Sequence, residues 1–301
     1  ELIVNILLTG GTGLIGSEFI RQYSRKHEFT VISRDVAKAK SKLGENVKIV
    51  ENVSSIENFE NFDAVINLAG EPIADKRWTD TQKKKICDSR WDITSELVSK
   101  INSCDTPPSV LLSGSAIGYY GNQGDKIVTE ETSPHHEFTH ELCAKWEAIA
   151  QSVDQAKTRV VTLRTGVVLT KKGGALGKMA LPFKLGAGGT LGSGSQYLAW
   201  IHLQDMVRAI SFLLENSACS GAFNLTAPEP VTNKEFSKAL AKSLNRPCLF
   251  NVPGFVMKVA MGDSSTMILE GQRVIPQKLT TVGFSFEFPS IDEALREIYR
   301  A

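Results

Sequence analysis

The sequence predicts an α/β fold built on a doubly wound parallel sheet, and three observations carry this expectation. An apolar run at residues 4–9 ends in glycines spaced three apart, Gly10, Gly13 and Gly16. Strand-like and helix-like segments then alternate along most of the chain, which favours a parallel sheet. Residues 63–70 form an almost continuous apolar run, as expected for a strand covered by helices on both faces. We therefore predict a Rossmann-like sheet with a smaller C-terminal substrate-side lobe.

The first glycine-rich segment is predicted to be a dinucleotide-binding loop. A strand that ends in such a loop passes into a helix whose first N–H groups are unpaired, so a pyrophosphate can bind there. Gly10 would permit the tight turn, Gly13 the close approach of a phosphate, and Gly16 close packing of helix on strand. Ordinary strand–turn–helix corners share this spacing, but here a strand precedes it and a helix is expected over 14–26. The predicted cofactor-binding residues of the loop are Gly10, Thr12, Gly13, Leu14, Ile15 and Gly16.

The remaining elements follow from hydrophobic periodicity. Short apolar runs bounded by polar residues predict strands, and longer stretches with an apolar stripe predict helices. Further strands are expected at 30–33, 47–50, 63–70, 109–113, 159–164 and 222–225, and further helices at 79–102, 139–155 and 203–215.

Composition narrows the class of protein. The chain has 301 residues, of which 42% are hydrophobic and 22% charged, as in ordinary globular proteins. A formal net charge of +1 gives no electrostatic reason to expect nucleic acid or a membrane surface as a partner. Five scattered cysteines lack Cys-x-x-Cys spacing, so we expect free thiols and no metal site. With no membrane-length apolar run and no signal-like leader, the expected location is cytoplasmic.

Several motifs resemble the extended short-chain dehydrogenase/reductase family, in its sugar-nucleotide epimerase and dehydratase group. They are Thr-Gly-Gly-Thr-Gly-Leu-Ile-Gly at 9–16, Asn-Leu-Ala-Gly at 67–70, Ser-Gly-Ser-Ala at 113–116 followed by Tyr-Tyr-Gly at 119–121, and Trp-Ile-His-Leu-Gln-Asp at 200–205. A narrower resemblance, to an uncharacterised epimerase family subgroup, covers nearly the whole length. It rests on residues 70–74, 77–78, 89–91, 164–169 and 270–276.

The end of the second strand indicates which coenzyme is bound. An acidic residue there would accept hydrogen bonds from the ribose hydroxyls and favour NAD. This chain has Ser33 and Arg34 there, with Asp35 one step later. A guanidinium fits a 2′-phosphate, so NADP is the expected cofactor, although a merely solvated arginine is the alternative. The resemblance also implies cofactor contacts from Leu68, Ala69, Gly70, Arg90 and Val167.

Catalytic residues are harder to assign. The superfamily resembled here uses a serine or threonine with Tyr-x-x-x-Lys, yet this sequence contains no Tyr-x-x-x-Lys. The resemblance places Ser115 in the serine position, Lys145 in the lysine position, and Glu141 where the tyrosine belongs. Ser115 would orient a substrate oxygen, Lys145 would hold the nicotinamide ribose, and Glu141 would transfer a proton if burial raised its pKa. His140 is a second proton-transfer candidate, and solvated roles for both helix residues are the alternative.

The expected domain organisation places an NADP-binding Rossmann domain at residues 1–170, completed by about 200–226. Residues 171–199 and 227–301 would form the substrate-side lobe. Eight glycines lie between residues 173 and 194. This segment is too long for an ordinary connection, so we expect it to cover a site or be disordered. Within the motif at 200–205, His202 and Asp205 are expected to be structural.

The function expected from these features is an NADP-binding oxidoreductase or epimerase-like activity. It would transfer a hydride reversibly to a small polar carbonyl or from the corresponding alcohol. Nucleotide-linked substrates are included in this class. The alternative is a non-catalytic protein that senses NADP(H), which the missing tyrosine suggests. A third hypothesis is redox-neutral chemistry such as dehydration. A small-molecule substrate is the expected partner, and related folds suggest a homodimer formed through helices 79–102 and 139–155.

Overall fold

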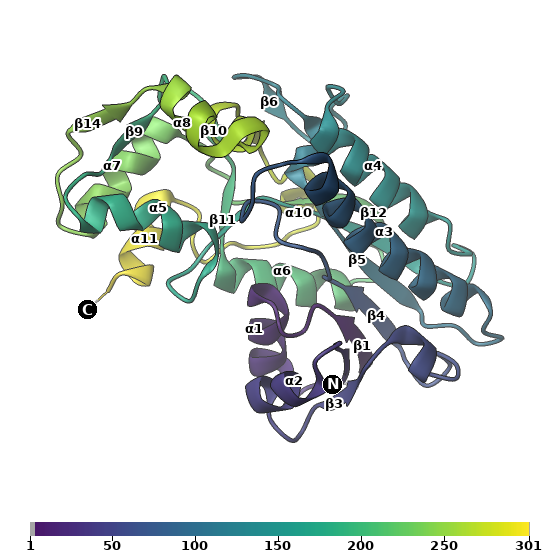
Figure 1. Cartoon of the computed structure of the whole chain (residues 1–301). Coiled ribbons are helices and arrows are strands. Elements are labelled where there is room, and N and C mark those ends of the chain that lie inside the picture. The colour runs from purple at the N-terminus through teal and green to yellow at the C-terminus, as the bar shows by residue number, and fades with distance from the viewer. Residues whose placement is uncertain (1–3, 301) are drawn as a thin grey trace.

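Residues 4–300 are described by the computed structural model, and a seven-stranded parallel sheet forms the centre of the molecule (Figure 1). Its strand order is β12-β7-β5-β4-β1-β2-β3, which reverses direction at β1 as in a doubly wound sheet. The predicted Rossmann-like fold is confirmed. The strands are β1 (Asn5–Thr9), β2 (Glu28–Ile32), β3 (Lys48–Val50), β4 (Ala64–Asn67), β5 (Val110–Ala116), β7 (Arg159–Thr165) and β12 (Gly221–Leu225).

Helices cover both faces of this sheet because alternate strand residues point to opposite sides. Ile6 and Leu8 of β1 join the core beneath α1 (Leu14–Tyr23) and α6 (Leu203–Glu215). Leu7, between them, joins the opposite core, which packs against two other helices. These are α3 (Asp80–Asn102) and α4 (Phe138–Gln151), while α2 (Val36–Leu43) lies near α1 and β3.

The second lobe has its own apolar core beside the sheet. Leu176, Phe183, Trp200, Phe236 and Leu295 are buried together there. Its helices are α5 (Gly174–Lys184), α7 (Asn233–Ser243), α8 (Gly254–Met261), α9 (Thr266–Leu269) and α11 (Ile291–Ile298). Helix α10 (Gln277–Thr281) instead packs on β12, and its Leu279 is buried in the core of the main sheet. Short strands pair in twos: β6 (Ile127–Val128) with β15 (Arg273–Val274), β8 (Val167–Leu169) with β11 (Trp200–His202), β9 (Gly189–Leu191) with β14 (Phe250–Val252), and β10 (Tyr197–Leu198) with β13 (Val231–Thr232).

Short 3-10 helices occupy three of the connections. They are η1 (Val53–Ser55), η2 (Ile117–Tyr120) and η3 (Gly262–Ser265). Of these, η2 directly follows β5 and contacts α4, so it lies at the carboxyl edge of the sheet. Ligands bind at this edge in doubly wound folds.

The glycine-rich stretch at 173–194 contains more regular structure than its composition suggests. Helix α5 forms within it, because Leu176, Ala180 and Phe183 recur at helical spacing and bury one face. Glycines gather at its ends, where Gly173 and Gly174 both have positive φ. The expectation of an irregular covering loop or disorder is therefore wrong for residues 174–184, which form a helix.

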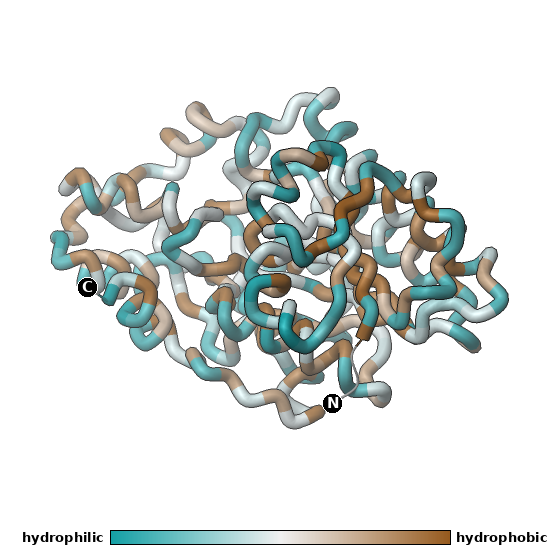
Figure 2. Tube along the Cα trace, turned by 90° about the horizontal axis from the view of Figure 1, so that it is seen from below, coloured by the Kyte–Doolittle hydropathy of each residue, from teal (hydrophilic) through white to brown (hydrophobic). Residues whose placement is uncertain are grey.

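Polar and apolar residues alternate along the helices (Figure 2). Among the helices at residues 4–300, we find none that combines the length and the apolar character needed to span a bilayer.

Candidate functional site

The glycine-rich loop between β1 and α1 has the shape of an anion-binding turn. Gly10 has a φ of +71°, and a Cβ there would lie 2.6 Å from the Leu68 carbonyl carbon. A Cβ on Gly16 would lie 2.4 Å from the Gly10 carbonyl oxygen, so larger residues cannot replace either glycine without movement. No side chain caps α1 at its N-cap, Gly13. The first N–H groups of α1 therefore suit a pyrophosphate oxygen.

The loop after β4 is joined to the end of β1 by hydrogen bonds. The backbone N–H of Leu68 donates to the Thr9 carbonyl at 3.2 Å. The Thr9 hydroxyl accepts from the Ala69 N–H at 3.2 Å and donates to Asn67 Oδ1 at 2.7 Å. Residues 68–70 thus lie against the glycine-rich loop. Two segments predicted to contact one cofactor share a single edge of the sheet.

Arg90 brings a cation from α3 to this edge. A Cβ on Gly70 would lie 2.8 Å from Arg90 Cζ, so the guanidinium packs directly on that glycine. Its Nη1 donates to the Ile86 carbonyl at 3.0 Å, and within residues 4–300 no carboxylate forms an ion pair with it. Burial lowers the pKa of Arg90, as expected for a cation taken from water without a counter-ion. A negatively charged ligand beside Gly70 would compensate this charge.

The residues that follow β2 lie beside the glycine-rich loop and carry both charges. Asp35 is the N-cap of α2, and its Oδ1 accepts the Lys38 backbone N–H at 2.9 Å. Its carboxylate is therefore engaged by the helix rather than directed to a ribose hydroxyl. Arg34 is exposed beside it, and Ser33 donates to the Val50 carbonyl through its backbone N–H. Because Thr9 pairs with Ile32, this turn neighbours the glycine-rich loop.

Ser115 belongs to a buried polar network at the end of β5. Its Oγ donates to Glu147 Oε1 at 2.7 Å. Arg164 donates to both carboxylate oxygens of Glu147, at 2.8 Å each, and to the Tyr120 hydroxyl at 3.0 Å. Tyr120 donates in turn to Asn224 Oδ1 at 2.6 Å. Ser115 therefore has a fixed acceptor, and its oxygen lone pairs can receive further hydrogen bonds.

The ionisation of this network is set by burial and pairing. Burial by itself would lower the pKa of Arg164, but its hydrogen bonds to Glu147 raise it above its ordinary value. Burial raises the pKa of Tyr120 to about 12, so its phenol stays protonated at neutral pH. Tyr120 is thus a hydrogen-bond donor here and not a ready proton acceptor.

Helix α4 carries the other catalytic candidates on different faces. Glu141 and Lys145 are exposed, and Lys145 Nζ lies 3.9 Å from the ring centroid of Trp91 on α3. His140 is buried instead, with Nδ1 2.7 Å from the Tyr119 carbonyl oxygen. Glu147, two turns further along the helix, is the α4 carboxylate that contacts Ser115. The catalytic roles of Ser115, Glu141 and Lys145 stay predictions.

Val167 lies where the sheet meets the second lobe. It begins β8, pairs with Trp200 of β11, and donates its N–H to the Ala199 carbonyl at 2.9 Å. Its side chain is partly exposed. It follows β7 at the carboxyl edge, the same edge as the loops after β1 and β4. Its cofactor contact stays a prediction on this placement.

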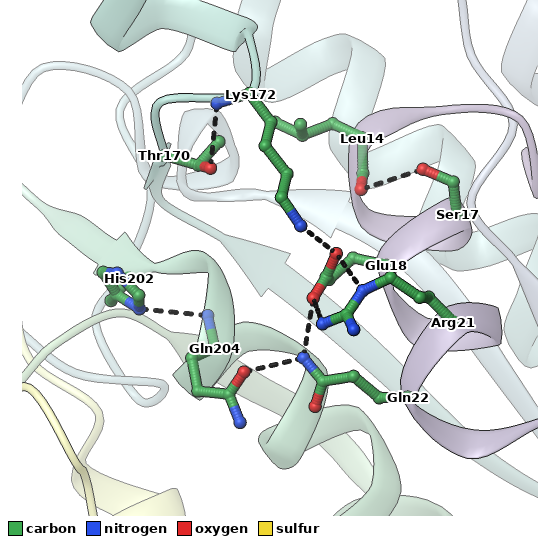
Figure 3. Close-up of polar contacts among 9 residues, drawn as sticks. All are labelled: Leu14, Ser17, Glu18, Arg21, Gln22, Thr170, Lys172, His202 and Gln204. Atoms are coloured by element: carbon green, nitrogen blue, oxygen red, sulfur yellow. Dashed lines mark hydrogen bonds and ion pairs between the residues drawn. The ribbon is translucent and has the colours of Figure 1, made fainter. Parts of the chain in front are cut away.

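Glu18 of α1 has polar contacts with its own helix and with the segment that precedes α5 (Figure 3). Its carboxylate accepts from Arg21, from Gln22 at 2.9 Å, and from Lys172 Nζ at 2.7 Å. These contacts lower the pKa of Glu18 to about 2, with Arg21 the largest cause. Lys172 precedes α5, so the ion pair joins that lobe to α1 (Figure 3).

His202 and Asp205 form structural contacts. His202 Nδ1 accepts the Gln204 N–H at 3.1 Å, capping α6, and Nε2 lies 2.9 Å from Glu297. Burial lowers the pKa of His202. Asp205 is fully buried and accepts the backbone N–H groups of residues 287 and 288. Both residues therefore make structural contacts between the start of α6 and residues 287–297.

Two pockets lie away from these loops. One of about 640 Å³ is lined by Asn5 and Glu28 at the amino ends of β1 and β2, opposite the glycine-rich loop. Another of about 380 Å³ lies between α1, His202 and Phe288. Neither pocket is lined by a residue predicted to bind the cofactor or the substrate. We therefore define the candidate site by the loops and polar groups at the carboxyl edge of the sheet, and not by either pocket.

The sequence did not point to Glu147 or Arg164 as residues of the site. A charged residue at the end of an otherwise apolar strand was a signal for Arg164, because buried arginines need a partner. Nothing in the spacing of α4 distinguished Glu147 from the helix's other acidic residue, Glu141. The structure separates them by the face on which each lies.

The strand order and the glycine-rich first turn define an α/β protein of the Rossmann type. The model of the NAD dependent epimerase/dehydratase family matches residues 6–226, and a domain of unknown function, DUF1731, matches residues 252–298. The chain belongs to the NAD dependent epimerase/dehydratase family.

Full-length relatives support this membership. Epimerase family protein SAR0825 of Staphylococcus aureus (strain MRSA252) is 36% identical over 295 residues, covering 97% of this chain and 98% of the relative. The chloroplastic epimerase family protein SDR39U1 homolog of Arabidopsis thaliana is also 36% identical, covering 99% of this chain and 87% of the relative. A crystal structure of human epimerase family protein SDR39U1 (isoform2) with NADPH is 34% identical, with a TM-score of 0.89 and coverage of 98% and 99%.

Proposed function

We propose that this protein binds NADP(H) and catalyses reversible hydride transfer on a small polar carbonyl or alcohol, nucleotide-linked substrates included. The observation that carries the proposal is the turn after β2, where Arg34 is exposed while the carboxylate of Asp35 caps α2. This arrangement offers a cation, and no free carboxylate, beside the glycine-rich loop. The human relative, crystallised with NADPH, supports the same coenzyme.

The coenzyme would lie along the carboxyl edge of the sheet. The uncapped N-terminus of α1 fits the pyrophosphate, and Arg34 fits a 2′-phosphate. Arg90 and residues 68–70 would contact the coenzyme farther along, towards Val167. When bound there, the nicotinamide ring supplies reversible acceptance of a hydride.

Ser115 is the proposed substrate-orienting residue. Because its own proton is donated to Glu147, the Ser115 oxygen can accept a hydrogen bond from a substrate hydroxyl. Arg164 holds Glu147 in place through hydrogen bonds to both carboxylate oxygens, which keeps this orientation fixed. Ser115 therefore positions the reacting oxygen without itself moving the proton.

For proton transfer, the geometry favours His140 over Glu141. The Tyr119 carbonyl can only accept, so His140 Nδ1 carries a hydrogen, and a ring with no second hydrogen has a lone pair on Nε2. His140 is buried, whereas Glu141 is exposed. Nε2 would take the proton of a substrate alcohol during oxidation and return it during reduction.

The test is coenzyme binding followed by turnover. Calorimetry should show heat with NADPH, and absorbance should report NADPH oxidation with a member of a carbonyl panel. His140→Gln should lower kcat about 100-fold or more, with Glu141→Gln as the matched control within about twofold. No binding of either nicotinamide coenzyme would overturn the proposal.

A second candidate function is a non-catalytic sensor of NADP(H). It is favoured by the missing Tyr-x-x-x-Lys. A sensor must respond differently to the two redox forms. Tight NADPH binding without turnover, together with hydrogen exchange that differs between NADP⁺ and NADPH, would support it over the enzyme.

A further inference from the structure

Helix α2 brings a second cation to the glycine-rich loop. The Nζ of Lys42 donates a 2.7 Å hydrogen bond to the carbonyl oxygen of Thr12. Thr12 lies between Gly10 and Gly13, in the turn that precedes α1. The ammonium group of Lys42 therefore lies across the gap between α2 and the loop.

This gap is where the adenosine ribose is expected. β1 and β2 are parallel neighbours, with Thr9 paired to Ile32, so both strands end at the same edge. In doubly wound folds, the 2′ position of the adenosine ribose lies between the first loop and the end of the second strand. Lys42 borders this position from the α2 side, as Arg34 borders it from the end of β2.

The cationic charge on this side of the gap is not neutralised. Lys38 and Lys42 are four residues apart, so they share a face of α2. Both are exposed, as is Arg34. Across residues 4–300, none of the three forms an ion pair with a carboxylate, and the adjacent Asp35 is committed to the helix cap. The Thr12 carbonyl is neutral and takes one N–H of Lys42, leaving two others for a ligand.

We propose that Lys42, together with Arg34, binds the 2′-phosphate of NADP(H). Lys42 is then a residue that determines which coenzyme is preferred. This inference rests on the proposed function. A phosphate between the two cations would accept charge-assisted hydrogen bonds from both. NADH has only a hydroxyl there, so Lys42 would strengthen binding of NADPH and not of NADH.

A purely structural role of Lys42 predicts a different result. If Lys42 only held the Thr12 carbonyl, its loss would disturb the pyrophosphate turn, which both coenzymes use. NADPH and NADH affinities would then fall together. The ratio of the two affinities separates the roles, because only contact with the 2′-phosphate changes it.

The experiment measures dissociation constants for NADPH and NADH by calorimetry. The variants are Lys42→Met, which keeps the apolar stem, and Lys42→Arg, which keeps the charge. Lys40→Met is the matched control, since Lys40 is exposed on the same helix but lies off the face shared by residues 38 and 42. Thermal melting of each variant checks that it is folded.

We expect Lys42→Met to weaken NADPH binding about tenfold and NADH binding less than twofold, as for the loss of a charge-assisted hydrogen bond. Lys42→Arg should retain most of the NADPH preference, and Lys40→Met should resemble the wild type. The fragment 2′,5′-ADP should lose affinity for Lys42→Met, whereas 5′-AMP should not.

Equal losses of NADPH and NADH affinity, or no loss at all, would overturn the role of Lys42 while leaving coenzyme binding intact. A wild-type protein that binds neither coenzyme would instead overturn the proposed function, and the inference with it. Binding of NADPH and NADH with equal affinity by the wild type would overturn the selection of the 2′-phosphate by Arg34 and Lys42 alike.

Discussion

Arg164 and Glu147 form a two-point ion pair inside the molecule, with Nε 2.8 Å from Oε1 and Nη2 2.8 Å from Oε2. The side chains are 6% and 11% exposed. The pair joins strand β7 to helix α4 directly beside Ser115, which shares Oε1. Helix position and hydroxyl orientation therefore depend on one carboxylate.

We expect Glu147→Ala to destabilise the fold by about 3–5 kcal/mol, because it leaves the Arg164 cation buried without a partner. Denaturant unfolding measures this loss. Glu141→Ala on the exposed side of α4 is the control and should change stability by less than about 0.5 kcal/mol. Equal, small effects of the two substitutions would show that the ion pair is not needed for stability.

Lys145 provides a second prediction. Its Nζ lies 3.9 Å from the centroid of the Trp91 ring. We therefore expect Lys145→Met to change NADPH affinity by less than about twofold, with a loss of stability of about 0.5–1 kcal/mol from the cation–π contact. A tenfold loss of NADPH affinity would show that Lys145 leaves Trp91 to hold the coenzyme, as the resemblance implies.

The parts of the fold that sequence could predict are those set by local rules. The loop at 10–16 was recognisable because left-handed backbone at Gly10 and the close approach at Gly16 both require glycine. The long helix was predicted at 79–102 from its apolar stripe and is observed at Asp80–Asn102. Its first turn is capped by Thr79, whose hydroxyl accepts the Gln82 N–H. Each signal lies within a few residues of the structure that it determines.

The parts that sequence could not predict depend on contacts between distant segments. Glu147 meets Arg164 only because α4 packs on the sheet beside β7, and spacing along the chain gives no sign of this. Lys145 likewise meets Trp91 across two helices. Helix α5 was obscured because glycines at its ends dominate the composition, although its buried positions have helical spacing.

Substitutions of Asp35 test whether its carboxylate contributes to the choice between NADPH and NADH. Because its carboxylate caps α2, Asp35→Ala should destabilise the protein by about 1 kcal/mol, whereas Asp35→Asn should preserve most of the cap. Neither substitution should weaken NADH binding by more than about twofold, since the carboxylate does not face a ribose. Unfolding and calorimetry measure the two effects. A marked loss of NADH affinity in both variants would place Asp35 on the ribose.

Glu18 should make stability depend on pH in the acid range. Its pKa is lowered from an ordinary 4.5 to about 2 in the folded state, so the unfolded chain binds its proton first as pH falls. The stabilisation is complete above about pH 4.5 and declines as pH falls towards 2. We expect the difference in unfolding free energy between wild type and Glu18→Gln to shrink below about pH 4.5. A difference that stays constant from pH 6 to pH 3 would show that Glu18 is not held ionised by its partners.

Helix α5 is anchored to the two segments that border the proposed coenzyme edge. Lys172, just before it, pairs with Glu18 of α1, and Lys178 within it pairs with Asp75 in the loop after β4. Gly173, the N-cap of α5, and Gly174, its first residue, both have positive φ, a backbone conformation that favours glycine. Both ion pairs hold α5 beside the proposed coenzyme edge, so we expect them to open when a bound coenzyme is released.

We therefore expect Lys172→Met combined with Lys178→Met to accelerate NADPH release about tenfold, while the equilibrium affinity changes less because entry is faster as well. Stopped-flow displacement measures the release rate, and high salt should accelerate release from the wild type more than from the double variant, since screening weakens only the pairs that remain. Lys171→Met is the control for removing one nearby positive charge. If the double variant and this control release NADPH at the wild-type rate, α5 does not restrain the coenzyme, and its two ion pairs serve only to position the lobe.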